Sequence, residues 1–338
     1  MLICAHFIVG VMVMADKIKL GIVGYGNLGR GVEKAVAQNP DMELVAIFTR
    51  RKPDEIKATV PVYPVSQAED FQEKIDVLIL CGGSATDLPE QGPHFARLFN
   101  TVDSYDNHAK IPEYFEKMDA AARERGHVCV ISTGWDPGLF SLNRLLTEAV
   151  LPQGETYTFW GKGISQGHSD AIRRVKGVKD GRQYTIPNEE AVQKVRSGEQ
   201  PQLTTRDKHR RECYVVPEEG ADLERIEREI KTMPHYFADY ETSVYFISEE
   251  ELREQHSGMP HGGLVLRSGL TGAGTKQVIE FGLKLDNNPE FTSSVLVAYA
   301  RAAARLAKKG EQGAKTPFDI PLGLLSPKSP EQLRRELL

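Results

Sequence analysis

Cysteine is scarce in this chain. Its 338 residues include four cysteines, which lie far apart and form no C-x-x-C pair. This spacing is typical of reduced thiols in a cytosolic protein and argues against a disulfide framework. We therefore expect a cytoplasmic protein. The four cysteines are Cys4, Cys81, Cys129 and Cys213.

Long apolar runs are also missing. A helix that crosses a membrane needs about 20 consecutive apolar residues, and the apolar stretch over residues 1–13 is shorter. That stretch lacks the positive start and the small-residue cleavage site of a signal peptide. The following residues, Met14-Ala15-Asp16-Lys17, resemble a second translation start just before the first predicted strand. We expect no membrane association and interpret residues 1–13 as an extension outside the fold.

The chain has no surplus of positive charge. Its formal net charge is -5 at pH 7 and no basic run is long, which argues against a nucleic-acid partner. His256 and His261 do not have the spacing of a zinc site, so we expect no metal. The length of 338 residues favours two domains over one.

The first half of the sequence alternates strands and helices. Residues 76–81 (DVLILC) are almost wholly apolar, as a buried parallel strand should be. Pro112 and Gly126 bound a helix at its start and its end. Alternation with short connections predicts a Rossmann-type doubly wound parallel sheet, an α/β fold. We expect strands over 17–23, 42–49, 60–65, 76–81, 101–103 and 128–132, with helices over 31–38 and 111–125.

The second half alternates apolar and polar residues, which is typical of antiparallel strands with one wet face. We expect an α+β substrate and dimerisation domain with a mostly antiparallel sheet. A helix over 291–309 should return to the first domain, followed by loops over 317–330. The predicted strands cover 156–160, 183–186, 212–216, 243–247, 264–267 and 276–285, and the predicted helices 140–150 and 218–233. The predicted domains are 14–134, 135–286 and 287–338.

A glycine-rich turn lies between the first predicted strand and helix. It reads Gly24-Tyr25-Gly26-Asn27-Leu28-Gly29, and the G-x-G-x-x-G pattern in this context predicts a dinucleotide site. Gly24 allows the tight turn, Gly26 lets the pyrophosphate approach, and Gly29 permits close helix–strand packing. The first N–H groups of the helix would face the phosphates. The alternative is an ordinary glycine turn.

The end of the second strand distinguishes the two nicotinamide cofactors. An NAD site has an acidic residue there, whereas this chain has Thr49-Arg50-Arg51. Guanidinium groups pair with a 2′-phosphate, so the sequence favours NADP. We expect the cofactor to pass Gly82-Gly83-Ser84 at the end of the fourth strand, with a plain strand-end turn as the alternative.

Two aspartates follow further strands. Asp106 lies in Ser104-Tyr105-Asp106-Asn107-His108, and Asp136 in Thr133-Gly134-Trp135-Asp136-Pro137-Gly138. Ligands of open α/β sheets bind outside the carboxyl ends of the strands, so both acids should lie near the nicotinamide. Aspartates in such loops also form Asx-turns or caps, and that alternative stays open.

Several long segments resemble the meso-diaminopimelate dehydrogenase family, and the resemblance runs from residue 17 to about residue 330. It implies NADP-dependent oxidation of the D-centre of meso-2,6-diaminopimelate to L-2-amino-6-oxoheptanedioate and ammonia, in lysine biosynthesis, by a homodimer. The segments are GYGNLGR (24–30), GSATDLPEQ (83–91), TVDSYDNH (101–108), STGWDPGLFS (132–141), FWGKGISQGHSDA (159–171), TMPHYF (232–237) and GMPHGG (258–263).

The resemblance also implies site residues. Asp106 and Asp136 become catalytic candidates, with Asp136 at the reacting amino group. We favour electrostatic positioning for both and leave the proton acceptor unassigned. The group that would hold the distal L-centre is Thr185, Arg211, His261 and Asn288. The other implied substrate contacts are Trp135, Trp160, Gln166 and Gly167. The implied cofactor contacts are Gly24, Tyr25, Gly26, Asn27, Leu28, Gly29, Thr49, Arg50, Arg51, Cys81, Gly82, Gly83, Ser84, Ser104, Tyr105, Thr133, Gly134, Trp135, Asp136 and Pro137.

Pattern alone gives plainer interpretations. Trp135 and Trp160 would be core or interface aromatics, Arg211 part of the solvated run 208–211, and His261 a loop histidine. Other functions also stay open: a related D-amino-acid dehydrogenase, an imine or semialdehyde reductase, or an NADP-sensing scaffold. A semialdehyde dehydrogenase needs a nucleophilic cysteine, and Cys81 and Cys129 in buried strands should be inert.

Overall fold

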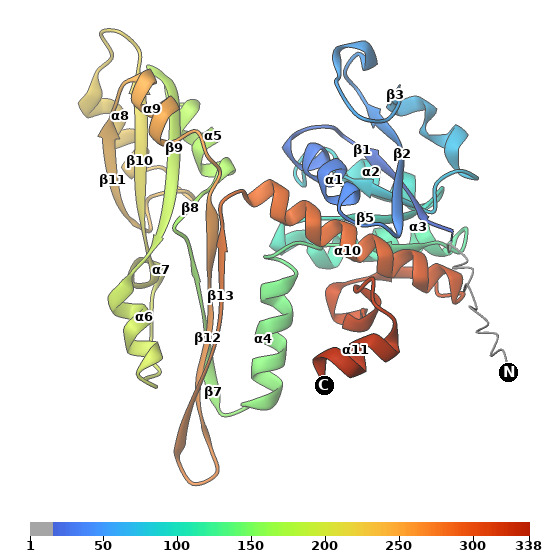
Figure 1. The fold of residues 1–338 in the computed structure, drawn as a ribbon. Coiled ribbons are helices and arrows are strands. Elements are labelled where there is room, and N and C mark those ends of the chain that lie inside the picture. The colour runs from blue at the N-terminus through green and yellow to red at the C-terminus, as the bar shows by residue number, and fades with distance from the viewer. Residues whose placement is uncertain (1–15) are drawn as a thin grey trace, which may run out of the picture. The chain divides into compact units, whose positions relative to one another are not determined.

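The computed structural model describes residues 16–338. The extension predicted over residues 1–13 lies outside the described residues. The chain divides into two compact units, coloured along the chain in Figure 1. Unit 1 contains the chain up to Ile131 together with Leu296–Leu338, and unit 2 is Ser132–Val295. Across residues 16–338, no helix is both long enough and apolar enough to cross a membrane.

Unit 1 is built on a seven-stranded sheet in the order β14-β6-β5-β4-β1-β2-β3, and every neighbouring pair is parallel. This confirms the predicted Rossmann-type fold. The short strand β3, which contains Pro64 and follows Pro61, lies at one edge of the sheet, as expected for a strand with proline. The strands are β1 (Ile18–Val23), β2 (Met42–Thr49), β3 (Val62–Pro64), β4 (Val77–Leu80), β5 (Asn100–Asp103), β6 (Val128–Val130) and β14 (Gly313–Lys315).

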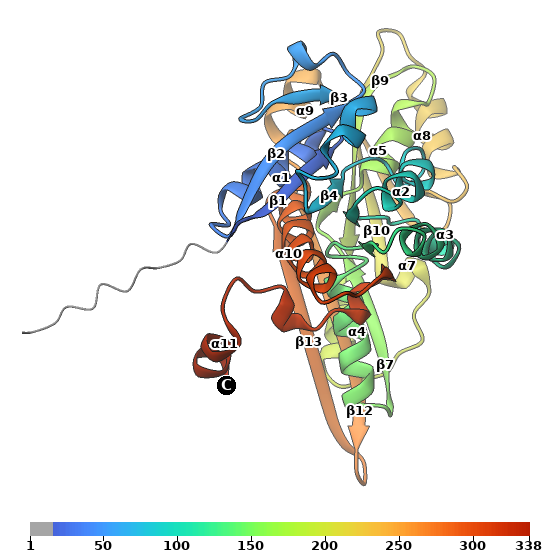
Figure 2. The same ribbon diagram turned by 90° about the vertical axis from the view of Figure 1, so that its right-hand side faces the viewer.

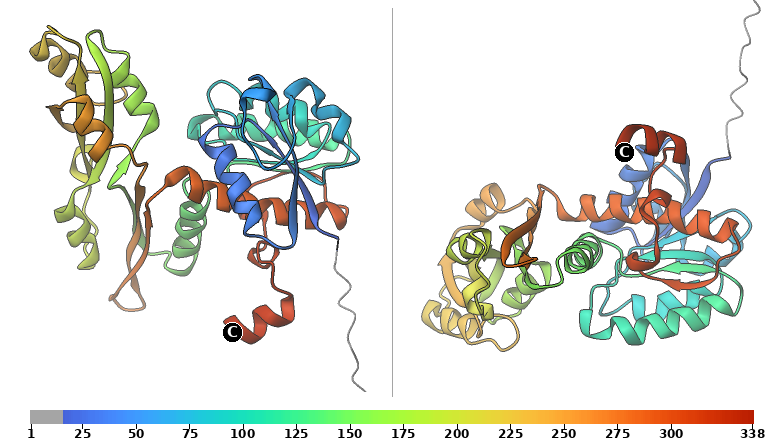
Figure 3. Two further views of the ribbon diagram at one scale, coloured as in Figure 1. Left: turned by 45° about the horizontal axis from the view of Figure 1, so that its top comes forward. Right: turned by 90° about the horizontal axis from the view of Figure 1, so that it is seen from below.

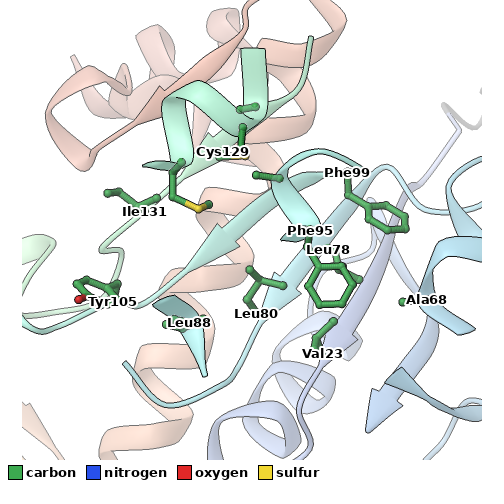
Figure 4. Close-up of a cluster of buried hydrophobic side chains, with 14 of the residues drawn as sticks. Val23, Ala68, Leu78, Leu80, Leu88, Phe95, Phe99, Tyr105, Cys129 and Ile131 are labelled. Carbon is green, nitrogen blue, oxygen red and sulfur yellow. The ribbon is translucent and has the colours of Figure 1, made fainter. Parts of the chain in front are cut away.

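Helices cover the sheet of unit 1 and enclose its core. Leu78 and Leu80 from β4 lie in one buried cluster with Phe95 and Phe99, as Figure 4 shows. The helices are α1 (Asn27–Ala37), α2 (Leu88–Ala96) and α3 (Ile111–Arg123), with short 3-10 turns at Pro53–Glu55, Val65–Phe71 and His108–Lys110. Helix α2 was not predicted because it contains Pro89, Gly92 and Pro93, which weaken helix signals.

The C-terminal segment adds to unit 1. Helix α10 (Asn288–Lys308) lies against this unit beyond Leu296 (Figure 3), where Arg301 is paired with Asp41. Strand β14 extends the sheet beyond β6 and was not predicted. The segment predicted as loops over 317–330 contains two 3-10 turns, Pro317–Asp319 and Leu322–Leu324, and is followed by α11 (Pro330–Leu337).

Unit 2 contains two sheets rather than the single sheet that the alternation suggested. One has the order β11-β10-β9-β8 and the other β13-β12-β7. All pairs are antiparallel except β10 with β11, which helix α8 (Leu223–Lys231) connects as a parallel crossover. Figure 2 shows the long β12–β13 hairpin beside β7. The strands are β7 (Gly154–Trp160), β8 (Gly163–Ile164), β9 (Val178–Pro187), β10 (His209–Pro217), β11 (Glu241–Phe246), β12 (His261–Thr271) and β13 (Thr275–Leu285).

The helices of unit 2 are mostly short and begin at polar caps. Ser165 caps α5, Asn188 caps α6, and Asp222 caps α8 through side-chain oxygens. Helix α8 is shorter than the predicted 218–233, because its cap at Asp222 starts it later. The helices are α4 (Leu139–Val150), α5 (Gln166–Arg173), α6 (Glu189–Arg196), α7 (Thr205–Lys208), α8 (Leu223–Lys231) and α9 (Glu249–Gln255).

Candidate functional site

The glycine turn of unit 1 joins β1 to α1. Gly24 has φ +91°, and a Cβ on Gly29 would lie 2.2 Å from the Gly24 carbonyl oxygen. The backbone conformation at Gly24 and the close packing at Gly29 therefore require glycine at both positions. A Cβ on Gly26 would meet no atom of the described chain within 4 Å. Packing does not require glycine there, and the space beside the start of α1 is open.

Two guanidinium groups lie beside this turn. Arg51 donates a side-chain hydrogen bond to the carbonyl of Tyr25, and its backbone N–H donates to Thr49 Oγ1 at 3.1 Å. Arg50 pairs with Asp87 at the start of α2, with 2.9 Å between Nη1 and Oδ1, and its side chain is 68% exposed. The arrangement keeps positive charge at the end of β2, where an anion can reach it.

Hydrogen bonds to Glu33, which the sequence did not predict, fix the loop after β2. Glu33 on α1 accepts hydrogen bonds from both the backbone N–H and the hydroxyl of Thr59 at 2.6 Å, and also from the hydroxyl of Tyr25. Burial, followed by Glu33, raises the pKa of Tyr25 to about 12. Burial alone would raise the pKa of Glu33, but its hydrogen bonds from Thr59 and Tyr25 outweigh it and lower the pKa.

The ends of β4 and β5 meet at the same sheet edge as the glycine turn. Ser84 accepts the backbone N–H of Asp106 at 3.1 Å, and the N–H of Gly83 donates to Asp87 at 2.9 Å. Tyr105 is buried and stacked on Tyr114. The predicted segments 81–84 and 104–106 are therefore neighbours. The carboxylate of Asp106 makes no hydrogen bond or ion pair with residues 16–338.

Asp136 lies in unit 2, in the loop before α4. Its side chain is 3% exposed, and its Oδ1 accepts from Arg144 Nη2 at 2.6 Å. Its Oδ2 accepts from Trp160 Nε1 at 2.7 Å. Gly138 shapes the loop, because its φ is +127° and a Cβ there would lie 2.0 Å from the Gly134 oxygen. The predicted segment 133–137 belongs to unit 2 with Asp136.

Trp135 connects two more predicted residues. Its indole Nε1 donates to Asn288 Oδ1 at 2.8 Å, and its ring lies 4.8 Å from that of His261, centroid to centroid. The Nδ1 of His261 accepts the backbone N–H of Gly262 at 2.8 Å. The same Nδ1 lies 3.2 Å from the carbonyl oxygen of Gly262. Burial lowers the pKa of His261, so the ring is neutral at neutral pH.

Arg211 is a buried cation on β10. The residue is 6% exposed, its guanidinium donates to Thr185 Oγ1, and no carboxylate of the described chain pairs with it. Its Nε is buried without a hydrogen-bond partner among residues 16–338. The plain interpretation of a solvated basic run is therefore wrong for Arg211, because strand alternation turns it inward while Arg210 stays outside. A buried guanidinium that pairs with no carboxylate of residues 16–338 can pair with an anion.

Neutral histidines surround this cation. Burial, followed by the charge of Arg211, lowers the pKa of His168 to about 4 and that of His209 to about 3. His209 Nε2 accepts the backbone N–H of Trp160 at 2.8 Å, and the two rings are stacked. Both rings are therefore neutral at neutral pH, beside the charged guanidinium of Arg211.

Gln166 and Gly167 begin α5 and are exposed. Gln166 Nε2 contacts Met259 Sδ at 3.7 Å. A Cβ on Gly167 would meet no atom of the described chain within 4 Å. The structure thus leaves room beside the first turn of α5 without a direct contact to Arg211.

The cysteines of the described chain offer no nucleophile. Burial raises the pKa of Cys81, and it raises the pKa of Cys129 and that of Cys213 to about 12. Such thiols stay protonated at neutral pH. Within residues 16–338, no cluster of three or more His, Cys, Asp or Glu side chains is arranged to hold a metal ion.

Comparisons with known proteins agree in both sequence and structure. The sequence model of the Diaminopimelic acid dehydrogenase C-terminal domain matches residues 134–287. Meso-diaminopimelate D-dehydrogenase of Ureibacillus thermosphaericus is 68% identical over 325 residues, covering 96% of this chain and 100% of the relative.

Two solved structures match nearly the whole chain. The Corynebacterium glutamicum DAP dehydrogenase in complex with DAP has a TM-score of 0.89 at 48% identity, covering 95% of this chain and 99% of that chain. An engineered D-amino acid dehydrogenase bound to NADP+ has a TM-score of 0.84 at 47% identity, covering 95% and 100%. This chain therefore belongs to the meso-diaminopimelate dehydrogenase family.

Proposed function

We propose that the chain catalyses the NADP-dependent oxidative deamination of the D-centre of meso-2,6-diaminopimelate. The products are L-2-amino-6-oxoheptanedioate and ammonia. The observation that supports this proposal within the structure is Arg211, a buried guanidinium that pairs with no carboxylate of residues 16–338. A substrate carboxylate would complete that site, and family membership supplies the reaction.

The residues of unit 1 fit a phosphorylated dinucleotide. The open side of Gly26 admits the pyrophosphate, and Arg50 and Arg51 would hold a 2′-phosphate that an acidic residue would repel. When bound, NADP+ supplies the acceptor for the hydride that leaves the α-carbon. The NADP+ complex of the engineered relative supports this choice of cofactor.

The residues of unit 2 fit the two zwitterionic ends of the substrate. Arg211 with Thr185 and the imidazole of His261 would bind the distal carboxylate, and Asn288 helps to fix the ring of Trp135. Asp136 would accept a hydrogen bond from the reacting amino group. In unit 1, the unpaired carboxylate of Asp106 is the second candidate for that role.

The chemistry requires deprotonation before hydride transfer. The substrate ammonium loses a proton, hydride leaves the α-carbon, and water then adds to the imine so that ammonia departs. No step needs a covalent nucleophile, which agrees with the protonated cysteines. We further propose a cytoplasmic homodimer, as expected for this family.

One assay tests the function. The purified protein is mixed with NADP+ and meso-, LL- or DD-diaminopimelate, D-alanine or L-glutamate at alkaline pH, and NADPH absorbance is followed. Turnover confined to the meso isomer supports the proposal, and turnover of D-alanine would point to a broader D-amino-acid dehydrogenase. Tight NADP+ binding without turnover of any amino acid would instead support a sensing or scaffold role.

A further inference from the structure

Arg144, a residue that the sequence did not single out, contacts both oxygens of Asp136. Its Nη2 donates to Oδ1 at 2.6 Å and its Nη1 reaches Oδ2 at 3.5 Å. Trp160 donates to the same Oδ2 at 2.7 Å. A carboxylate has about four acceptor positions, so these three contacts use most of them.

The guanidinium of Arg144 is itself held from two sides. Its Nη1 contacts Thr158 Oγ1 on β7 at 3.3 Å, and its Nη2 contacts Ser141 Oγ on α4 at 3.2 Å. Arg144 stands on α4, two turns beyond the loop of Asp136. The planar guanidinium therefore contacts the loop of Asp136, helix α4 and strand β7 at once and fixes their relative positions.

Trp160, the other partner of Asp136, is also supported from behind. Its backbone N–H donates to His209 Nε2 at 2.8 Å, and its ring is stacked on the imidazole with centroids 5.2 Å apart. Asp136 is thus buried and fixed from both sides before any ligand arrives. These contacts fix the direction in which the carboxylate oxygens of Asp136 point.

We propose that Arg144 is a positioning residue for Asp136, holding the carboxylate so that one acceptor position is left for the reacting amino group. This inference rests on the proposed function, in which Asp136 faces that group. Arg144 balances the negative charge of the buried carboxylate. Asp136 therefore orients the amine through the direction of a hydrogen bond rather than through an unbalanced charge. Asp136 then serves as a fixed hydrogen-bond acceptor for the amine.

Kinetic measurements test the proposal with two variants. Arg144→Met removes the charge and both contacts, and we expect kcat/KM for meso-diaminopimelate to fall about 100-fold, as when one partner of a buried charge pair is lost. KM for NADP+ should change little. Arg144→Lys keeps the charge without the fork and should recover part of the loss.

Arg225→Met is the matched control. Arg225 is a half-buried arginine of unit 2 that pairs with Glu229 at 2.7 Å and with the carbonyl of Lys176 at 2.6 Å. Its loss should leave kcat/KM unchanged. A purely structural role for Arg144 would instead lower the melting temperature while the folded protein kept its kinetic constants, and that result would overturn the proposal.

A second readout needs no turnover. The chain has two tryptophans, so a Trp135→Phe background leaves Trp160 as the only one. Adding Arg144→Met should shift the emission of Trp160, because Asp136 is released from its indole, whereas adding Arg225→Met should not. Unchanged emission and unchanged kcat/KM would each refute the positioning role. Inactivity of the unmodified protein with a clear emission shift would refute the proposed function and leave the positioning of Asp136 standing.

Discussion

The guanidinium of Arg211 lies over the ring of Tyr240, with its Cζ 3.9 Å from the ring centroid. Tyr240 lies just before β11, in a segment that sequence reasoning did not connect with the site. The ring covers one face of a buried cation that pairs with no carboxylate among residues 16–338. It therefore holds the guanidinium plane in place, while Nε at the edge has no partner in the described chain and can meet a carboxylate.

Removal of that ring should weaken substrate binding. Tyr240→Leu should raise KM for meso-diaminopimelate about 10-fold, since a desolvated cation–π contact contributes about 1–2 kcal/mol. Tyr240→Phe keeps the aromatic face and should stay close to the parent protein. Steady-state kinetics at saturating NADP+ measures both. Tyr245→Leu, which removes an exposed tyrosine of β11, is the control and should leave KM unchanged.

The two arginines at the end of β2 should select the cofactor. Each charge-assisted hydrogen bond contributes about 1.5–3 kcal/mol, so Arg50→Ala with Arg51→Ala should raise KM for NADP+ at least about 100-fold. KM for the amino acid should stay nearly constant, and the preference for NADP+ over NAD+ should largely disappear. Arg97→Ala removes an exposed arginine that pairs with Glu124 and serves as the control. Loss of both arginines without effect on KM for NADP+ would contradict the cofactor assignment.

The pairing of Arg301 with Asp41 and Asn39 should stabilise unit 1. Arg301 is 2% exposed, and its Nε and Nη2 donate to Asp41 at 2.7 and 2.8 Å. Asp41→Ala leaves a buried guanidinium without its acid and should cost about 3 kcal/mol in the free energy of unfolding. Glu113→Ala breaks an exposed helix pair and should leave stability almost unchanged.

The same pair predicts acid sensitivity. Its hydrogen bonds and charge lower the pKa of Asp41. The stabilisation is therefore complete above the unfolded value of about 3.9, and it is lost as the pH falls through the folded value. Melting temperatures between pH 7 and pH 3 should fall less steeply in Asp41→Ala than in the parent protein. If the melting temperature depended on pH equally in both proteins, the protonation of Asp41 would not be coupled to unfolding.

His209 should make unit 2 lose stability on mild acidification. Its folded pKa is lowered to about 3, first by burial and then by Arg211 and Lys208. The unfolded chain binds the proton near pH 6.5, so below that pH stability falls by about 1.4 kcal/mol per pH unit for this one group. The stabilisation is fully present above pH 6.5 and is lost as the pH falls toward the folded value.

A substitution isolates that contribution. His209→Gln can still accept the N–H of Trp160 but does not titrate, so its free energy of unfolding between pH 6 and pH 4 should depend less on pH. Urea unfolding at each pH gives the slope. His94→Gln, an exposed histidine of unit 1, should leave the slope as it is. An unaltered slope in His209→Gln would mean that His209 is not the group responsible.

Much of unit 1 could be read from local pattern. The continuous apolar strand 77–80 and the glycine turn at 24–29 follow from short-range rules, because burial on both faces and a tight turn leave few choices of residue. Strand β14 could not be predicted. Its three residues carry no periodic signal, and only pairing with β6 makes them a strand. In unit 2 the strands were expected, but their division into two sheets depends on long-range pairing.

The sequence by itself determined the Rossmann-type fold, the glycine turn and the two arginines beside it, since each depends on residues close together in the chain. Tertiary structure decided three features: the burial of Arg211 without a carboxylate partner in the described chain, its stacking on Tyr240, and the contacts of Arg144 with Asp136. Their partners come from different strands, helices and loops. Sequence pattern reports which residues share a face of one element, whereas the charge balance of a buried site depends on which elements the fold brings together.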